Sequence, residues 1–321
     1  MIDFSDDRAA ADSLSIKVKE LKKEIGKIIV GQHDVVNGVI TSIISNGHAL
    51  LIGVPGLAKT LMIKTISESL DMSFNRIQFT PDLMPSDIVG SEILDDNRNF
   101  KYNKGPVFSN IVLADEINRT PPKTQAALLE AMQERNVTVS GTKYVLPDPF
   151  FVLATQNPIE QEGTYPLPEA QLDRFMFNMV LDYPTFEEEI SIVKATTTNQ
   201  KISVSNILTR EEILGFQSLV RKVPVPDNVY EYAVKLVSKT RAGRENATAK
   251  INEYVDYGAG PRASQYLIVG AKANALINGK YSPDIEDVQA VAKLVLRHRM
   301  VRNYKAEAEG ITTDTLIESI Y

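Results

Sequence analysis

The feature that most constrains the fold is the glycine-rich segment 53–60, which reads Gly-Val-Pro-Gly-Leu-Ala-Lys-Thr. It follows the apolar run His48–Ile52, which predicts a buried strand, and it precedes a segment with helical spacing. A strand, a glycine-rich turn and a helix in this order bring backbone N–H groups to a helix N-terminus, where they can bind phosphate. The pattern matches a P-loop, except that Ala58 replaces the usual last glycine. The alternative is a glycine-rich turn that only caps a helix, and the flanking strand and helix disfavour it.

A P-loop assigns a chemical task to each of its polar groups. We expect the backbone N–H groups from Gly56 to Thr60 to surround a β-phosphate. Lys59 would reach the β- and γ-phosphate oxygens, and the Thr60 hydroxyl would bind Mg²⁺.

The first two thirds of the chain alternate short apolar runs with helical patterns, which predicts an α/β fold with a parallel sheet. A helix is expected over about 121–134, with Thr120 as its N-cap and Pro121 in its first position. Segments 91–102 and 137–146 resemble hairpins inserted before the third and fourth strands, and both are expected to project from the domain. The four further predicted strands are 74–79, 111–114, 150–154 and 177–181.

After about residue 182 the signals become helical. Thr185 with Glu188 and Thr209 with Glu212 form capping boxes, and Pro226 and Pro283 lie where helices could begin. The polar stretch 196–200 predicts a linker. We therefore expect a nucleotide-binding domain over 1–190, followed by a smaller all-helical domain over 206–321.

Composition excludes several other classes of protein. The hydrophobic share of 43% and charged share of 24% are typical of globular chains. The net charge of −6 argues against a global nucleic-acid-binding surface, and the absence of cysteine excludes disulfides, thiolate metal sites and a cysteine nucleophile. The three histidines form no metal-ligand pair. With no bilayer-length apolar run and no basic N-terminal export segment, the sequence predicts a cytoplasmic protein.

The second chemical signal is the run Ile111-Val-Leu-Ala-Asp-Glu116. A buried strand would deliver Asp115 to its carboxyl end, where open α/β sheets bind ligands. Asp115 would hold Mg²⁺ through water, and Glu116 would orient or deprotonate an attacking water, which indicates hydrolysis. The alternative is that two acidic residues simply end a strand at the surface.

Four further positions, one of them weaker than the rest, complete the candidate set. Asn157 follows the fourth strand and could hold the lytic water against the γ-phosphate, although Asn-Pro is also a common turn. Arg174 and Arg262 are candidates for stabilising charge on the γ-phosphate, with Arg119 a weaker one. A single arginine is more often a surface or ion-pair residue.

The base preference follows from a missing motif. The guanine-specific Asn/Thr-Lys-x-Asp is absent, and the Asp-Ile-Val-Gly of 87–90 does not follow a buried strand. ATP is therefore expected rather than GTP.

Taken together, these residues resemble the AAA+ ATPases, and most closely the MoxR family. The likeness extends over nearly the whole chain, and Ala58 fits it because MoxR-like P-loops often carry alanine there. The motifs that carry it are Ile29-Val-Gly-Gln32, Gln78-Phe-Thr-Pro-Asp-Leu83, Gly105-Pro-Val-Phe108, Ala114-Asp-Glu-Ile-Asn-Arg119, Gln125-Ala-Ala-Leu-Leu-Glu-Ala-Met-Gln-Glu134, Ala154-Thr-Gln-Asn-Pro158, Gly163-Thr-Tyr-Pro-Leu-Pro-Glu-Ala-Gln-Leu-Asp-Arg-Phe175 and Gly260-Pro-Arg262.

The resemblance implies an αβα nucleotide domain with a helical lid. It implies that Asn157 is sensor 1, Arg174 the finger given to a neighbour's ATP, and Arg262 the sensor 2 arginine, and that 30–32 lies near adenine. The hairpins would be the helix-2 insert and the presensor-1 hairpin. The residues expected to contact the nucleotide are Val30, Gly31, Gln32, Gly53, Val54, Pro55, Gly56, Leu57, Ala58, Lys59, Thr60, Leu61 and Asp115.

A finger acting in trans implies a ring, most often a hexamer. Family members are thought to act as chaperone-like remodellers, often with partners that contain von Willebrand factor A domains. Three alternatives remain open: a nucleic-acid motor or loader of the helicase type, a subunit like that of magnesium chelatase, and a nucleotide-sensing scaffold. The first is disfavoured because the hairpin 137–146 carries only Lys143 as a cation, and the last because of Glu116.

Overall fold

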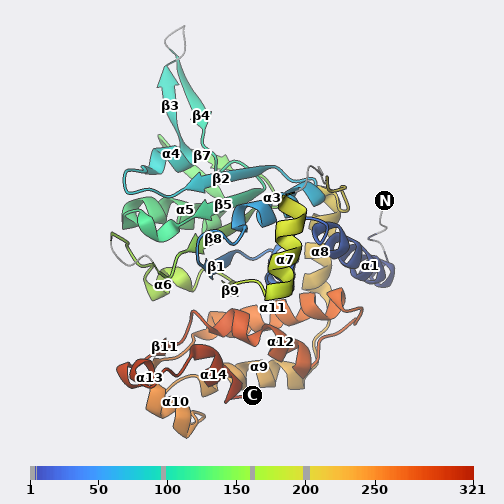
Figure 1. Ribbon diagram of the computed structural model, residues 1–321, viewed down its shortest axis with the longest axis vertical. Helices are drawn as coiled ribbons and strands as arrows, with labels where there is room; N and C mark the ends of the chain where they lie inside the picture. Colours follow the sequence, from blue (N-terminus) through green and yellow to red (C-terminus); the bar gives the residue numbers. More distant parts are fainter. Residues whose placement is uncertain (1–3, 5, 95–98, 160–162, 198–202) are drawn as a thin grey trace.

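The chain builds a five-stranded parallel sheet with helices on both faces (Figure 1). The computed structural model describes residues 4, 6–94, 99–159, 163–197 and 203–321. The strand order is β2-β5-β8-β1-β9, so β1 lies between β8 and the edge strand β9. The bounds of these strands are Ala49–Gly53 (β1), Phe74–Gln78 (β2), Ile111–Asp115 (β5), Phe151–Gln156 (β8) and Phe177–Leu181 (β9).

All five strands lie within two residues of the segments that apolar patterning predicts, which confirms the fold class. The reason is visible in the central strands, where successive side chains enter different cores. Ile111 and Leu113 pack into one hydrophobic cluster, whereas Val112 and Ala114 pack into the other. A strand buried on both faces must be apolar at every position, so it appears in the sequence as a continuous run.

Helices from the first half of the chain cover the two faces of the sheet. The cluster that contains Ile111 also holds side chains of α1 (Asp7–Ile25), α2 (His33–Ile44) and α3 (Lys59–Ser69). The cluster that contains Val112 holds side chains of α4 (Pro85–Val89) and α5 (Pro122–Glu134).

The predicted start of α5 is wrong by one residue. Pro121, not Thr120, is the N-cap, because the Thr120 hydroxyl donates instead to the carbonyl of Thr80, 3.0 Å away.

Two hairpins interrupt the alternation, as the sequence predicts. Strands β3 (Gly90–Leu94) and β4 (Phe100–Lys104) form a ribbon that projects from the domain (Figure 1), and the turn residues 95–98 lie outside the described residues. Strands β6 (Asn136–Val139) and β7 (Thr142–Val145) form the second hairpin. Its base belongs to the domain core, because Val137 and Leu146 are buried beside α5 residues.

Residues after β9 are mainly helical, and both predicted capping boxes are present, at Thr185 and Thr209. Pro226 caps α9, whereas Asp284, one residue after Pro283, caps α12. The predicted linker 196–200 overlaps the end of α7, and 198–202 lie outside the described residues. The helices are α6 (Glu169–Leu172), α7 (Phe186–Thr196), α8 (Arg210–Lys222), α9 (Asp227–Lys239), α10 (Ala249–Tyr254), α11 (Pro261–Ile277), α12 (Ile285–Leu296), α13 (Tyr304–Ala308) and α14 (Thr313–Glu318).

The expectation of an entirely helical C-terminal part is wrong in one place. Strand β10 (Val255–Tyr257) pairs antiparallel with β11 (Val301–Arg302), two short segments with too few residues to give a strand pattern in the sequence. The helical part packs against the rest of the chain, because α12 contacts β9 and α1 contacts α8 and α11. The Ser15 hydroxyl of α1 also donates to the carbonyl of Ile277. None of the helices in the described residues has the length and apolarity needed to cross a membrane.

Candidate functional site

The predicted phosphate-binding turn and the acidic pair meet in one cavity at the carboxyl edge of the sheet. The turn follows β1, and Asp115 ends β5, two positions away in the strand order. The cavity measures about 450 Å³. It is lined by Pro55, Gly56, Ala58, Lys59, Thr60, Leu61, Arg76, Gln78, Asp115 and Glu116.

The turn has the backbone geometry of a phosphate cradle despite its alanine. Gly56 has φ +86°, and Ala58, with φ +54°, also occupies the left-handed region that glycine tolerates best. Helix α3 begins at the next residue, so its first N–H groups face the cavity without intrahelical partners. Nothing lies within 4 Å of the position that a Cβ of Gly56 would occupy, so the cradle is open at that point.

Lys59 is buried beneath this turn. Its Nζ donates to the carbonyl of Gly53 at 2.8 Å. Burial lowers the pKa of Lys59, while the carboxylates of Asp115 and Glu116 act to raise it. A buried ammonium with nearby carboxylates is well suited to meet an additional anion.

Asp115 is a buried carboxylate with both oxygens engaged. Its Oδ1 accepts from the Thr155 hydroxyl at 2.6 Å, and its Oδ2 forms an ion pair with Arg76, at 2.6 Å from Nη2 and 3.1 Å from Nε. Only 10% of the Asp115 side chain is exposed, so the ion pair with Arg76 compensates a charge that water hardly reaches.

Glu116 is held in a fixed orientation next to Asp115. Its backbone has φ +59°, which turns the chain sharply after the strand, and its N–H donates to the Thr155 hydroxyl. Its Oε2 accepts from Gln78 at 2.8 Å and from Arg119 at 3.0 Å. Arg119, a weaker candidate for contact with phosphate, therefore pairs with the acidic residue.

Sequence reasoning missed Arg76 and Gln78. Both belong to β2, and because strand side chains alternate, residues two apart share one face. Their signal was present: two polar residues at alternate positions of a strand predicted next to the one that carries Asp115.

Other residues predicted to contact the nucleotide do not line the cavity. Asn157 is buried and follows Gln156, the last residue of β8, which pairs with Ile52 of β1. The Oδ1 atom of Asn157 accepts from the N–H of Ile159. Segment 30–32 lies against the residues that join β9 to α7, since Gln32 Nε2 donates to the carbonyl of Asp182. Gly53, Val54 and Leu57 are not among the described residues that line the cavity.

Arg174 and Arg262 lie at the opposite edge of the sheet. They line a separate cavity of about 200 Å³ together with Asn46, Gly47 and His48, the residues just before β1. The phosphate-binding turn follows the same five-residue strand. At about 3.3 Å per residue, β1 separates these arginines from the turn by roughly 16 Å.

The donor set fits a hydrated magnesium ion held together with a nucleotide. Thr60 and Asp115 both line the cavity and supply one hydroxyl and one carboxylate. No cluster of three or more His, Cys, Asp or Glu side chains that could hold a metal alone occurs in the described part of the chain. Mg²⁺ usually keeps several waters and takes its remaining ligands from phosphate oxygens, so two protein groups suffice.

Comparison with known proteins decides the family. Residues 48–177 match the ATPase family associated with various cellular activities (AAA), and residues 247–320 match the AAA lid domain. Chaperone MoxR1 of Mycobacterium tuberculosis is 42% identical over 97% of this chain and 83% of its own length. The chain belongs to the MoxR family of AAA+ ATPases. This MoxR-type chain is also 42% identical to the uncharacterized protein YeaC of Bacillus subtilis, over 93% of this chain and 91% of that one.

A solved structure agrees with this family. The crystal structure of a Cytophaga hutchinsonii protein assigned as an ATPase superposes with a TM-score of 0.90 and 45% identity, covering 97% of this chain and 95% of the other. The MoxR-type fold therefore extends through the lid as well as the nucleotide domain.

Proposed function

We propose that this MoxR-type ATPase binds ATP with Mg²⁺ and uses hydrolysis to remodel or mature partner proteins. The observation that carries the proposal is the single cavity lined by Lys59, Asp115 and Glu116. A buried ammonium, a metal-binding carboxylate and a second carboxylate at one sheet edge match the parts that P-loop hydrolysis requires. The name of the relative MoxR1, a chaperone, supports the remodelling role.

Binding follows from the turn and the helix behind it. The N–H groups from Gly56 to Thr60 surround the β-phosphate, and Lys59 exchanges the Gly53 carbonyl for phosphate oxygens. Thr60 and Asp115 would hold the metal ion, which would supply positive charge to neutralise the phosphates. Asp115 would have to release Arg76 in part to do so.

Hydrolysis is assigned to Glu116 and Asn157. The Glu116 carboxylate, fixed through Oε2 by Gln78 and Arg119, orients an attacking water and accepts its proton. Asn157 uses its Oδ1 to accept from Ile159, so Nδ2 is the group that it offers to the γ-phosphate or the water. Segment 30–32 is assigned to the adenine side of the site, and ATP is preferred because the guanine-specific motif is missing.

Arg174 and Arg262 are assigned to a neighbouring copy's ATP. The length of β1 separates them from the turn of their own chain, farther than an arginine side chain spans. Action in trans requires copies arranged head to tail in a closed ring, for which a hexamer is proposed. A partner with a von Willebrand factor A domain is proposed from the family resemblance alone.

The test is a substrate trap. Glu116→Gln removes the base but keeps the phosphate cradle, so ATP stays intact and client proteins should remain bound. Proteins captured by this variant with ATP are compared with those captured by Lys59→Ala, which lacks the phosphate contact. A set of proteins retained by Glu116→Gln and not by Lys59→Ala supports remodelling.

Capture of the same proteins by both variants contradicts remodelling. ATP turnover that is stimulated by DNA favours a helicase-like motor instead. A magnesium-chelatase-like role predicts a metal-insertion enzyme among the captured proteins.

A further inference from the structure

Residues 173–176, which include Arg174, form the finger segment. Asp173 joins this segment to the lid through two ion pairs. It lies between α6 and β9, directly before Arg174. Its Oδ2 is 3.0 Å from Nη1 of Arg262, at the start of α11, and its Oδ1 is 2.7 Å from Nε of Arg299, which follows α12. One carboxylate therefore contacts two arginines of the lid, one of which is the proposed sensor 2 residue.

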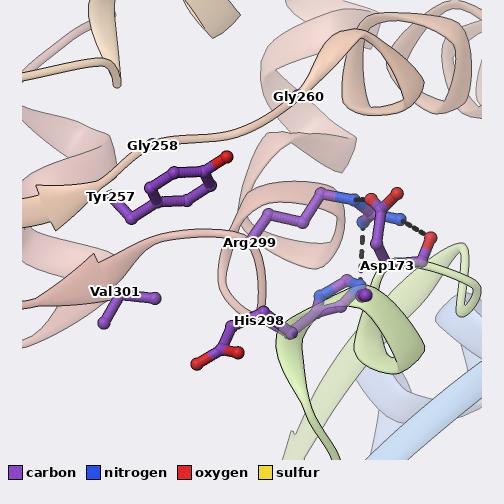
Figure 2. Close-up of a pocket in the computed structure, with 9 residues that line it drawn as sticks. Asp173, Tyr257, Gly258, Gly260, His298, Arg299 and Val301 are labelled. Carbon is purple, nitrogen blue, oxygen red and sulfur yellow. Dashed lines mark hydrogen bonds and ion pairs between the residues drawn. The ribbon is translucent and has the colours of Figure 1, made fainter.

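Arg299 also holds the backbone of the finger segment. Figure 2 shows its side chain extending from the lid to Asp173 along one side of a cavity of about 580 Å³. Its Nη2 donates to the carbonyls of Asp173, at 2.9 Å, and of Phe175, at 2.7 Å, and its Nη1 donates to the carbonyl of Met176 at 3.3 Å. The residues on both sides of Arg174 are thus fixed by one lid residue.

Neighbouring groups reinforce the same connection. His298 Nε2 lies 3.0 Å from the carbonyl of Phe175, and the hydroxyl of Tyr266 in α11 donates to the carbonyl of Arg174 at 3.4 Å. The guanidinium of Arg299 stacks over the Tyr266 ring, 5.0 Å from its centroid. The finger segment cannot move relative to the lid without breaking several of these contacts.

The burial of Arg299 makes Asp173 difficult to replace. Only 2% of the Arg299 side chain is exposed, compared with 30% for Asp173 and 43% for Arg262. A buried guanidinium that loses its counter-charge is strongly unfavourable. Loss of the Asp173 charge would therefore disturb both Arg299 and Arg262.

We propose that Asp173 is a positioning residue, held by Arg299, that fixes Arg174 and Arg262 as one unit for the ATP of the neighbouring copy. The inference rests on the proposed function, in which both arginines act in trans. Asp173 touches no residue that lines the phosphate-binding cavity of its own chain in any described contact, so its effect should appear only at the adjacent site.

The first measurement separates turnover from binding. Asp173→Asn keeps the size of the side chain but removes its charge. We expect ATP affinity and KM close to wild type and kcat lower by about 10²-fold, as small displacements of catalytic groups typically cause. Asp173→Glu, which keeps the charge, should recover part of kcat. A loss of ATP affinity equal to the loss of kcat would overturn the proposal.

The decisive measurement mixes subunits. Glu116→Gln subunits cannot cleave ATP but carry intact arginines, whereas Asp173→Asn subunits have an intact cavity but displaced arginines. Rings assembled from both should release phosphate several-fold faster than the two separate preparations combined, because Glu116→Gln subunits supply their arginines to the cavities of Asp173→Asn subunits. If Asp173→Asn damaged the cavity as well, the mixed rings would show no increase in phosphate release.

Arg174→Ala mixed with Glu116→Gln is the control. If this control recovers activity and the Asp173→Asn mixture does not, Asp173 does not act through the arginines and the inference is wrong. If the control itself fails, the arginines do not act in trans and the proposed arrangement fails with the inference. If Asp173→Asn does not fold, the same two tests are applied to Arg299→Lys, with the same expected results. This variant keeps the positive charge but loses the guanidinium that contacts several groups at once.

Discussion

At the scale of single residues, Arg76 lies beside the proposed metal-binding carboxylate of Asp115. Its guanidinium pairs with the Asp115 oxygen that would otherwise be available to Mg²⁺ or its waters. The same guanidinium also contacts Gln78, which in turn holds Glu116. The Arg76 side chain on β2 thus connects the two acidic residues of the site and would compete with the proposed metal ion for Asp115.

Removal of Arg76 should therefore favour the metal. We expect Arg76→Ala to lower the Mg²⁺ concentration at half-maximal nucleotide binding, because Asp115 no longer has to leave an ion pair. Titration of Mg²⁺ at saturating ATP measures the shift, with nucleotide retention as the readout. Lys64→Ala removes a largely exposed cation of α3 and is the matched control, since the ion pair of Lys64 with Glu68 spans 3.9 Å and lies on the helix surface. An unchanged or higher Mg²⁺ requirement for Arg76→Ala would count against this account.

A second residue makes stability depend on pH. His48 is fully buried, with Nε2 3.0 Å from the carbonyl of Met132 and Nδ1 accepting from the N–H of Val152. Burial, with a further contribution from Arg135, lowers the pKa of His48 to about 3. The unfolded chain binds this proton near pH 6.5 and the folded chain does not, so stability is complete above pH 6.5 and is lost as the pH falls toward 3.

The matched variant is His48→Gln, which can make both hydrogen bonds but does not titrate. Between pH 7 and pH 4.5 the wild type should lose roughly 2–3 kcal/mol more unfolding free energy than the variant. Urea denaturation at the two pH values measures the difference. The histidine at 298, whose pKa burial also lowers, is present in both proteins and cancels. If the unfolding free energies of both proteins depend on pH equally, His48 is not the source of this pH dependence.

At the scale of elements, the two hairpins contact each other through an aromatic pair. The rings of Tyr102 in β4 and Tyr144 in β7 lie 4.1 Å apart between centroids, and Tyr102 also makes an edge contact with Phe108. The projecting ribbon is therefore attached through Tyr102 to the hairpin that follows α5.

A double-mutant cycle with Tyr102→Leu and Tyr144→Leu measures this attachment. We expect a coupling of about 1 kcal/mol in unfolding free energy, within the usual range for aromatic pairs. Additive effects of the two substitutions would show that the hairpins are energetically independent.

How much of these elements could be predicted depends on how local their cause is. The strands with residues buried on both faces, such as 111–114, show as apolar runs, and the capping boxes at Thr185 and Thr209 have short-range signatures. The β10–β11 pair and the role of Arg76 depend on partners far apart in the sequence. No local pattern encodes such contacts, so sequence reasoning missed them.

At the scale of the whole molecule, the cavity beside Lys59 and the arginines Arg174 and Arg262 lie at opposite edges of one sheet. The sequence identified both sets of residues through motifs, but it left open whether Arg262 serves its own ATP. The ion pair between Arg262 and Asp173 ties Arg262 to the edge that carries Arg174. Long-range topology, rather than the motif, supports action in trans.

This arrangement predicts the behaviour of Arg262→Ala. Under dilute conditions that keep copies apart, the variant should bind ATP as tightly as wild type, because Arg262 does not reach its own site. In assembled protein, turnover should fall substantially, toward the 10³-fold or greater loss typical when an arginine finger is removed. Equilibrium nucleotide binding at low protein concentration, combined with phosphate release at high concentration, checks both statements. Weaker binding by the isolated copy would contradict action in trans.

The turn ending in Lys59 and the pair Asp115 and Glu116 should act on one ATP molecule. ATP retention and phosphate release, followed together in wild type, Lys59→Ala and Glu116→Gln, test this joint action. Wild type should retain and cleave ATP, Glu116→Gln should retain it but cleave at least about 10²-fold more slowly, and Lys59→Ala should do neither. Retention and cleavage by Lys59→Ala at the wild-type level would contradict the account.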